Sequence, residues 1–144
     1  MKRLAYIIII LISYTSLSHS KEINCASSNV NVIDADTIKL CDIKIRLNGI
    51  SAAERGHKTY KSCKNTVEKI ISEFDTISCK LTGDMTYDRH VGTCTVSKKG
   101  KTEDLQQKII ENGCARDCKR YSKGMYKIFE TEASRELPLP NYCK

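Results

Sequence analysis

Residues 29–47 read NVNVIDADTIKLCDIKIRL, and this stretch decides the fold. Two runs rich in β-branched side chains are separated by Asp34-Ala35-Asp36, and residues 43–47 then alternate apolar and polar side chains. β-Branched runs separated by turn residues are typical of strands joined by tight turns. The pattern predicts a three-stranded meander in which the Arg46 side chain lies on the face opposite to its apolar neighbours. The predicted strands are residues 29–33, 37–40 and 43–47.

Two further strands and three helices are predicted after the meander. Apolar residues at helical spacing predict helices over residues 60–74 and 105–110, and the second is ended by Asn112-Gly113. A third helix is predicted over residues 121–133, with Ser122 as its N-cap. We therefore expect an α+β fold, a disulfide-stapled and closed five-stranded β-barrel of the oligonucleotide-binding (OB) type with three helices. The last two predicted strands are residues 76–81 and 91–96.

The first 20 residues predict a secretory signal peptide. Lys2 and Arg3 precede an apolar run over residues 6–12, which is shorter than the roughly 20 residues needed to span a bilayer. Ser18-His19-Ser20 then places small residues where a signal peptidase cuts. Cleavage after Ser20 would leave one secreted or periplasmic domain, residues 21–144, as a monomer with no stable membrane association. An uncleaved amphipathic anchor is the alternative interpretation.

All eight cysteines follow the predicted cleavage point. An even number of cysteines in an exported chain predicts disulfides. Zinc is the alternative, but the sequence contains no C-x-x-C pair, and only His57 and His90 remain as histidine ligands. Cys79 and Cys94 are equally far from the midpoint of the predicted hairpin, which predicts a disulfide between them. The other six cysteines allow about 15 pairings, and the sequence does not choose among them.

Basic residues exceed acidic ones by a modest margin. The formal net charge is +7, and it falls to +5 when Lys2 and Arg3 are removed with the signal peptide. This excess suits an acidic partner such as nucleic acid, although it does not establish one. The short basic run formed by Lys98, Lys99 and Lys101 is interpreted as a solvated turn in preference to a phosphate-binding track.

A set of charged residues in and after the meander suits cleavage of a phosphodiester. Carboxylate oxygens hold a hard divalent cation, and guanidinium groups clamp a phosphate with two parallel hydrogen bonds. A remaining carboxylate can take the proton from the attacking water. Each residue alone would be an ordinary turn, strand or helix-entry residue, but together they predict a nuclease. The set consists of Asp34, Asp36, Arg46, Glu54 and Arg89.

Four segments of the chain resemble the staphylococcal nuclease (thermonuclease) family. Residues 32–40, VIDADTIKL, and 45–54, IRLNGISAAE, resemble the family patterns V-x-D-G-D-T and R-L-x-G-I-D-A-P-E. Residues 87–94, YDRHVGTC, are similar to Y-G-R-x-x-G/A-x-x. Residues 110–122, from IENGCA to RYS, resemble V-x-x-G-x-A followed by R-Y-S. Because the four motifs keep their order and spacing, the resemblance extends over roughly residues 29–136.

The resemblance implies a Ca²⁺-dependent nuclease that hydrolyses DNA and RNA, preferably single-stranded, with low sequence specificity. Arg46 and Arg89 would hold the scissile phosphate and stabilise the charge of the transition state. Glu54 would act on the attacking water as a base or by positioning it. Tyr87 and Tyr121 would contact the substrate, with packing in the fold as the alternative for each.

The resemblance also implies a metal site, in which this chain departs from the family. Asp36 would be a direct Ca²⁺ ligand, Asp34 would orient the turn or lie behind the ligands, and the backbone carbonyl of Ala52 could also bind the metal. Ser51 replaces the second acidic ligand, and because Ca²⁺ affinity follows the charge of the ligands, we expect reduced affinity and activity. The alternatives are a nuclease-like nucleic-acid-binding domain without turnover and an exported domain that binds another protein. The other departures are Ala35 for glycine, Ala53 for proline and Asp88 for glycine.

Overall fold

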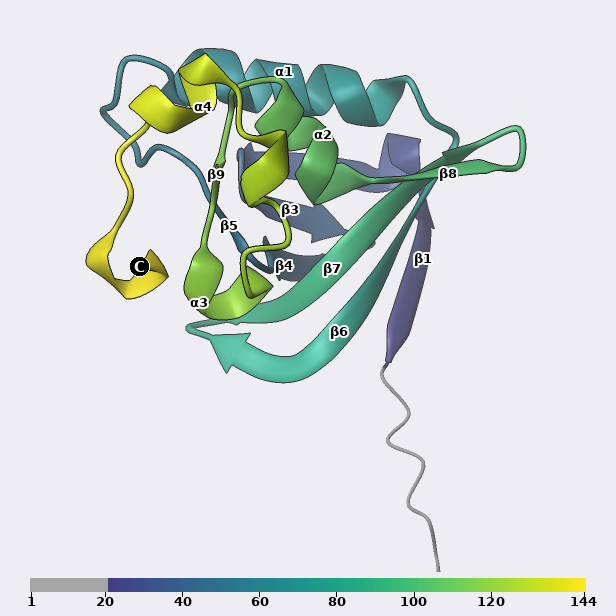
Figure 1. Ribbon diagram of the computed structural model, residues 1–144. Coiled ribbons are helices and arrows are strands. Elements are labelled where there is room, and N and C mark those ends of the chain that lie inside the picture. Colours follow the sequence, from purple (N-terminus) through teal and green to yellow (C-terminus); the bar gives the residue numbers. More distant parts are fainter. Residues whose placement is uncertain (1–20) are drawn as a thin grey trace, which may run out of the picture.

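A computed structural model describes residues 21–144 as an α+β fold made mostly of strands (Figure 1). The predicted signal peptide, residues 1–20, lies outside the described residues. The strands are β1 (Glu22–Ala26), β2 (Val30–Asp34), β3 (Thr37–Leu40), β4 (Ile43–Leu47), β5 (Ile50–Ser51), β6 (Thr76–Thr86), β7 (Arg89–Lys98), β8 (Lys101–Asp104) and β9 (Arg116–Asp117). The helices are α1 (Tyr60–Ser72), α2 (Leu105–Glu111), α3 (Lys119–Ser122) and α4 (Glu132–Glu136), with short 3₁₀ turns at Ser27–Asn29, Lys127–Phe129 and Asn141–Cys143.

The main sheet joins the predicted meander to the later hairpin. Its strand order is β1-β6-β7-β4-β3-β2, with β8 paired to β7, and β5 and β9 form a separate two-stranded sheet. The meander β2-β3-β4 and its turn at Ala35-Asp36 are confirmed. The pairing of β4 with β7 is parallel, whereas the other pairs of the main sheet are antiparallel. This parallel pair brings the meander and the hairpin side by side.

The strand pairing within residues 21–144 differs from the predicted closed barrel of five strands. The main sheet has seven strands, and β1 and β2, at the two ends of its path, do not pair with each other. The chain bends at Ser27–Asn29 instead, so that β1 pairs with β6 and β2 pairs with β3. Strand β8 has the sequence KTED, and because it lacks alternating apolar residues, the pattern rule missed it.

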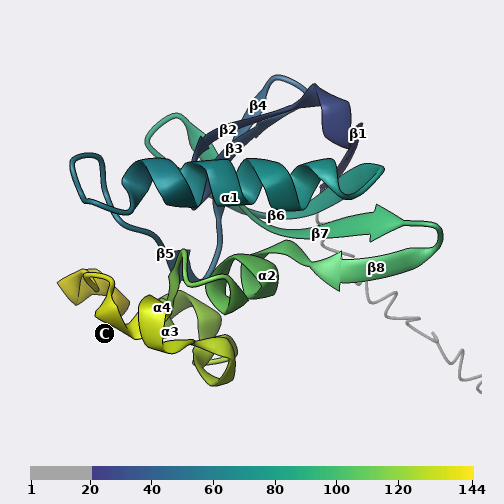
Figure 2. The ribbon, with the colours of Figure 1, turned by 90° about the horizontal axis from the view of Figure 1, so that it is seen from above.

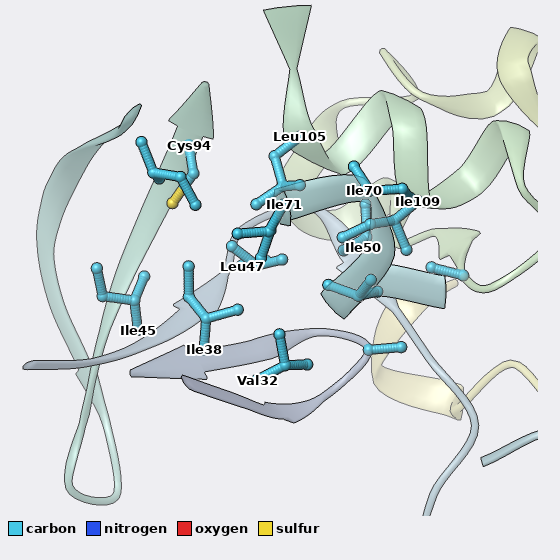
Figure 3. Close-up of a cluster of buried hydrophobic side chains, with 14 of the residues drawn as sticks. Val32, Ile38, Ile45, Leu47, Ile50, Ile70, Ile71, Cys94, Leu105 and Ile109 are labelled. Carbon is cyan, nitrogen blue, oxygen red and sulfur yellow. The ribbon is translucent and has the colours of Figure 1, made fainter. Parts of the chain in front are cut away.

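The hydrophobic core lies between the curled sheet and helices α1 and α2 (Figure 3). Figures 1 and 2 show α1 lying over the top of the sheet. Its buried residues Cys63, Val67, Ile70 and Ile71 recur at the three- and four-residue spacing of a helix face, as the sequence predicts. Full burial of an aliphatic side chain contributes about 1.5–3 kcal/mol, so this face holds α1 on the sheet.

The predicted single helix over residues 121–133 is wrong. Helix α3 ends at Ser122, since Lys123 and Gly124 both have the positive φ angles of left-handed backbone, 59° and 84°. Ser122 is therefore the last residue of a helix, and its predicted role as an N-cap is also wrong. Its hydroxyl donates to the buried carboxylate of Asp117, a contact that the local sequence does not indicate.

Four disulfides use all eight cysteines, which confirms disulfides over the zinc alternative. The predicted bond between Cys79 and Cys94 is confirmed, because these residues are directly opposite in the β6–β7 hairpin. Disulfides are typical of oxidising compartments. Within residues 21–144, no helix is long and apolar enough to cross a membrane. The remaining bonds are Cys25–Cys41, Cys63–Cys114 and Cys118–Cys143.

Candidate active site at the turn between strands β2 and β3

The turn that carries the two aspartates is held by its own side chains. Asp34 ends β2, and its carboxylate accepts a hydrogen bond of 3.1 Å from the backbone N–H of Asp36. This Asx-type contact is one reason why aspartate is favoured in turns. Ala35 does not lie in the left-handed region of the backbone, so the turn does not need the glycine that the family pattern has there.

Asp36 is the centre of the site. Its side chain is buried, with 7% of the residue exposed. One carboxylate oxygen accepts from the backbone N–H of Ala52 at 2.8 Å and forms an ion pair of 3.0 Å with Arg46. The other oxygen accepts from the hydroxyl of Thr37 at 3.1 Å. A buried charge needs such partners, and here they join three segments that are separate in the sequence.

Arg46 is held by the backbone as well as by Asp36. Its Nη1 donates to the carbonyl oxygens of Leu47 at 2.9 Å, Ile50 at 3.0 Å and Asp36 at 3.4 Å. The carbonyls of Leu47 and Ile50 flank the turn between β4 and β5, where Gly49 has a φ of 78°. The guanidinium is thereby fixed in one orientation, which leaves its remaining N–H donors available to a ligand.

Arg89 reaches the same centre through Thr37. Its Nη1 donates to the Thr37 hydroxyl at 3.1 Å, and that hydroxyl donates to Asp36. The sheet order explains the contact, since β4 lies between β3 and β7. Thr37 of β3 pairs with Arg46 of β4, and Arg46 pairs with Val91 of β7. Three adjacent strands therefore supply the bridging hydroxyl and both arginines.

Burial and the neighbouring carboxylate of Asp36 both affect the pKa of Asp34. Burial is the larger cause and the charge of Asp36 the next, and together they raise the pKa of Asp34 from 3.8 to about 6. Ionising Asp34 is therefore costly while Asp36 is charged nearby. The turn concentrates negative charge next to two guanidinium groups.

The segment from β5 to the loop before α1 carries three predicted site residues, Ser51, Ala52 and Glu54. Ser51 lies in β5, is 2% exposed and pairs with Arg116 of β9. Ala52 is at the site through its N–H group. Glu54 is exposed in the loop between β5 and α1, and no hydrogen bond or ion pair among residues 21–144 joins its carboxylate to the site. The structure therefore brings Ala52 into contact with Asp36 and Ser51 next to it in the chain, but it does not bring Glu54 into contact with the turn.

The two predicted substrate-binding tyrosines lie on different elements. Tyr87, in the turn between β6 and β7, is 92% exposed, and the Arg89 guanidinium lies 5.8 Å from the centre of its ring. Tyr121 is half exposed in α3, with the guanidinium of Arg120 5.8 Å from its ring. Both rings are therefore available to a ligand rather than packed in the core. Only Tyr87 is connected, through Arg89, to the turn of Asp36.

Two supporting features were missed in the sequence. The hydroxyl of Thr37 bridges Asp36 and Arg89, and its place in the Asp-Ala-Asp-Thr motif was the available signal. The second is the buried carboxylate of Glu130, which accepts from the backbone N–H of Asp117 at 3.0 Å and lies 3.6 Å from Arg116. It holds β9, which pairs with β5 behind Ser51. No local pattern indicates a contact between residues so far apart in the chain.

The oxygen atoms around the turn suit a hard cation in kind but are poor in charge. Carboxylate, hydroxyl and carbonyl oxygens are the ligands that Ca²⁺ takes. However, the Asp36 carboxylate is already paired with Arg46, and Ser51 adds no charge. Residues 21–144 contain no cluster of three or more His, Cys, Asp or Glu side chains arranged to hold a metal.

Comparison with known proteins finds a distant similarity. No family model matches the chain. The chain is 29% identical over 106 residues to the succinoglycan biosynthesis protein ExoI of Rhizobium meliloti (strain 1021). The match covers 67% of this chain and 54% of that protein, so the chain spans about half the length of the curated relative it matches. A similarity of this extent does not establish membership of a family.

Proposed function

We propose that this chain is a secreted nuclease of the staphylococcal nuclease type, which hydrolyses phosphodiester bonds of DNA and RNA with low sequence specificity. The observation that carries the proposal is the bridge from Arg89 through Thr37 to Asp36, whose carboxylate also pairs with Arg46. Two guanidinium groups beside a carboxylate suit the binding of a phosphate and the stabilisation of added negative charge. The four motifs of the family resemblance support the same reaction.

We also propose that the curled sheet is an OB-type barrel that is left partly open. The parallel pairing of β4 with β7 supports this topology. The bend at Ser27–Asn29 supports it as well, because β1 and β2 stand at opposite ends of the strand order but only three residues separate them in the chain. Because so short a connection joins the two strands at the ends of the sheet, the sheet has to curl. Proteins with OB folds commonly bind oligonucleotides across such a sheet.

The residues of the chain have distinct tasks in the proposed reaction. Arg46 is fixed by three carbonyl groups, so its free N–H donors are already oriented when a phosphate arrives. Arg89 is positioned by its hydrogen bond to the Thr37 hydroxyl. Together the two arginines stabilise the charge that develops on the phosphoryl oxygens. Glu54, exposed in the loop before α1, is the carboxylate available to take the proton from water. Tyr87 and Tyr121 offer exposed rings on which bases can stack, preferably those of single strands.

Ca²⁺ is the proposed cofactor. Asp36, the Ser51 hydroxyl and the Ala52 carbonyl would hold it, with Asp34 behind them. The support is the oxygen chemistry of these groups and the presence of two carboxylates, those of Asp34 and Asp36, in one turn. When bound, the ion would add positive charge next to the phosphate. For location and assembly, the four disulfides support a secreted or periplasmic protein, and we propose a monomer without stable membrane association.

A second candidate function is a nuclease-like domain that binds nucleic acid with weak or no turnover. The observation that favours it is the ion pair of Asp36 with Arg46, because this pair occupies the carboxylate that would hold the metal. The neutral Ser51 acts in the same direction. Such a domain would bind single strands in a salt-sensitive manner without giving a metal-dependent product.

The deciding experiment is digestion of single-stranded DNA by the purified, disulfide-bonded protein, in Ca²⁺ at about millimolar concentration and in chelator. Cleavage that requires Ca²⁺, is lost in Arg89→Ala and is kept in Arg135→Ala would establish the nuclease. Arg135 is the matched control because it lies in α4 and, within residues 21–144, its side chain donates to the carbonyl of Glu130 rather than to the site. DNA binding without cleavage would reject the nuclease in favour of the binding domain.

A further inference from the structure

We propose that a lysine-lined hollow at the far end of β7 binds the phosphate backbone of the same nucleic-acid strand that occupies the active site. The hollow has a volume of about 590 Å³ and lies where the β7–β8 turn meets α2 and the residues that follow α1. This inference rests on the proposed function, because it concerns a second contact of the same polymeric substrate. Four lysines line the hollow: Lys98, Lys99, Lys101 and Lys108.

Three of these lysines form the run that the sequence pattern assigns to a solvated turn, and a tight hairpin gathers them, so this proposal replaces that interpretation. Lys98 of β7 pairs with Lys101 of β8, and the two residues between them, Lys99 and Gly100, have positive φ angles of 49° and 79°. This is the backbone geometry of a two-residue hairpin turn. It places three ammonium groups at one tip of the sheet. Lys98 is further fixed by a hydrogen bond of 2.9 Å to the carbonyl of Glu73, which follows α1.

The fourth lysine comes from α2 and shares its partner with the hairpin. Glu103 forms ion pairs with both Lys101, at 3.0 Å, and Lys108. Lys99 has neither an ion pair nor a hydrogen bond among residues 21–144. Among residues 21–144, Glu73 and Glu103 are the two acidic residues that line the hollow, so they do not balance its four lysines. An unbalanced cluster of ammonium groups attracts phosphates without regard to base sequence.

One aromatic side chain, Phe74, also lines the hollow. Phe74 is half buried at the end of α1, and the ammonium group of Lys108 lies 5.3 Å from the centre of its ring. A partly exposed ring beside cations is the combination found where single strands bind, since bases stack on the ring while the cations hold the backbone. This combination favours single-stranded nucleic acid over an acidic polysaccharide, which has no base to stack.

The position of the hollow relative to the active site requires a long substrate. Strand β7 begins with Arg89 at the active site and ends with Lys98 at the hollow. Ten residues of extended strand span about 30 Å. Figure 1 shows the two turns that flank β7 at opposite ends of the strand. A strand of a few nucleotides reaches only one of the two sites, whereas a longer strand binds both and gains affinity from the second contact.

The test measures binding of fluorescent oligothymidylates to the full protein in chelator, so that it does not depend on cleavage. One probe has about 4 nucleotides and the other about 16, the range of site sizes for a single OB domain. The variant is Lys99→Asn with Lys101→Gln, because asparagine tolerates the left-handed backbone at position 99. The matched control, Lys21→Gln with Lys64→Gln, removes two positive charges outside the hollow.

The hollow variant should bind the long probe about 5- to 25-fold more weakly at about 0.1 M salt, because each phosphate contact adds about 0.7 to the salt slope of a single strand. Its slope of log affinity against log salt should be smaller by about 1.4. The short probe should bind as it does to the unaltered protein. Equal loss in the control variant, or equal loss for both probes, would overturn the proposal. Polygalacturonate, an acidic polysaccharide, is the second probe. If the hollow variant lost binding to polygalacturonate while its oligonucleotide binding was unchanged, the hollow would be assigned to acidic polysaccharide and the proposal would be overturned.

The same proteins separate this inference from the proposed function. Length-dependent binding without Ca²⁺-dependent cleavage would reject the nuclease but keep the hollow as a binding site. Cleavage of long and short strands by the hollow variant at unaltered relative rates would keep the nuclease and reject the hollow.

Discussion

The guanidinium of Arg89 and the hydroxyl of Thr37 are joined by a hydrogen bond of 3.1 Å between the first residues of two strands that are not neighbours. Strand β4 lies between β3 and β7, and it carries Arg46. Because the Thr37 hydroxyl also donates to Asp36, it fixes both the arginine and the carboxylate with respect to each other. This one hydroxyl group thus links Arg89 to the carboxylate of the candidate active site.

Thr37→Val should lower kcat for single-stranded DNA by about 10- to 100-fold, because a small displacement of a positioning group costs this much. Valine keeps the shape of threonine but removes the hydroxyl that fixes Arg89. Thr37→Ser should retain most of the activity, since it restores the hydroxyl, and Thr93→Val in β7 is a control for general effects of the substitution. Initial rates in Ca²⁺ measure the effect, and full activity of Thr37→Val would contradict it.

Ser51→Asp should raise Ca²⁺ affinity by at least about 10-fold, since the affinity of such sites follows the charge of their ligands. Position 51 is buried, so the added carboxylate should lower the melting temperature in chelator and Ca²⁺ should restore it. Ser51→Asn is the matched control, because it has nearly the same shape without the charge. Thermal unfolding with and without Ca²⁺ measures both effects. An equal response of the two variants to Ca²⁺ would mean that position 51 does not contact the metal.

Asp34→Asn should stabilise the protein at about pH 8 but not at about pH 3. The pKa of Asp34 is raised from 3.8 to about 6 in the folded protein, so below 3.8 the group is protonated whether the chain is folded or not. As the pH rises through 6, ionisation of the buried group removes stability from the folded state. Asparagine avoids this loss, and allowance for solvent screening at the partly exposed side chain leaves a gain of about 1 kcal/mol.

Urea unfolding at the two pH values measures the effect of Asp34→Asn. Asp42→Asn is the control, because the hydrogen bond and charge of Lys39 lower the pKa of Asp42, so this substitution should bring no gain at the higher pH. A gain for Asp34→Asn that is independent of pH would show that Asp34 ionises normally and that the stabilisation has another origin.

Replacing Cys118 and Cys143 by serine should lower the free energy of unfolding by about 3 kcal/mol, as expected for a cross-link of 25 residues. The bond ties the chain end to the residue before α3, so the double variant should also be cut by trypsin near the C-terminus before the rest of the chain. Guanidinium unfolding and timed proteolysis measure the two effects. A variant as stable as the unaltered protein would show that packing of the tail, including the buried Leu137, is sufficient.

Local patterns predicted those parts of the fold whose stability depends on nearby residues. The meander, the face of α1 and the Cys79–Cys94 bond follow from alternation, helical spacing and hairpin symmetry, and the structure confirms all three. The helix over residues 121–133 failed because contacts to Asp117, several residues earlier, hold Ser122 and the N–H of Tyr126 outside a continuous helix. Tertiary hydrogen bonds here outweigh the helical spacing of the apolar residues.

The sequence by itself determined the chemistry that is available: the carboxylates and arginines of the motifs, the even set of cysteines and the basic run near residue 100. Only the tertiary structure decided which of these groups meet. The order of β3, β4 and β7 brings Thr37, Arg46 and Arg89 together, while Glu54 stays apart and exposed. Residue type is a local property, whereas contact between distant residues depends on strand pairing and burial, which the whole chain determines cooperatively.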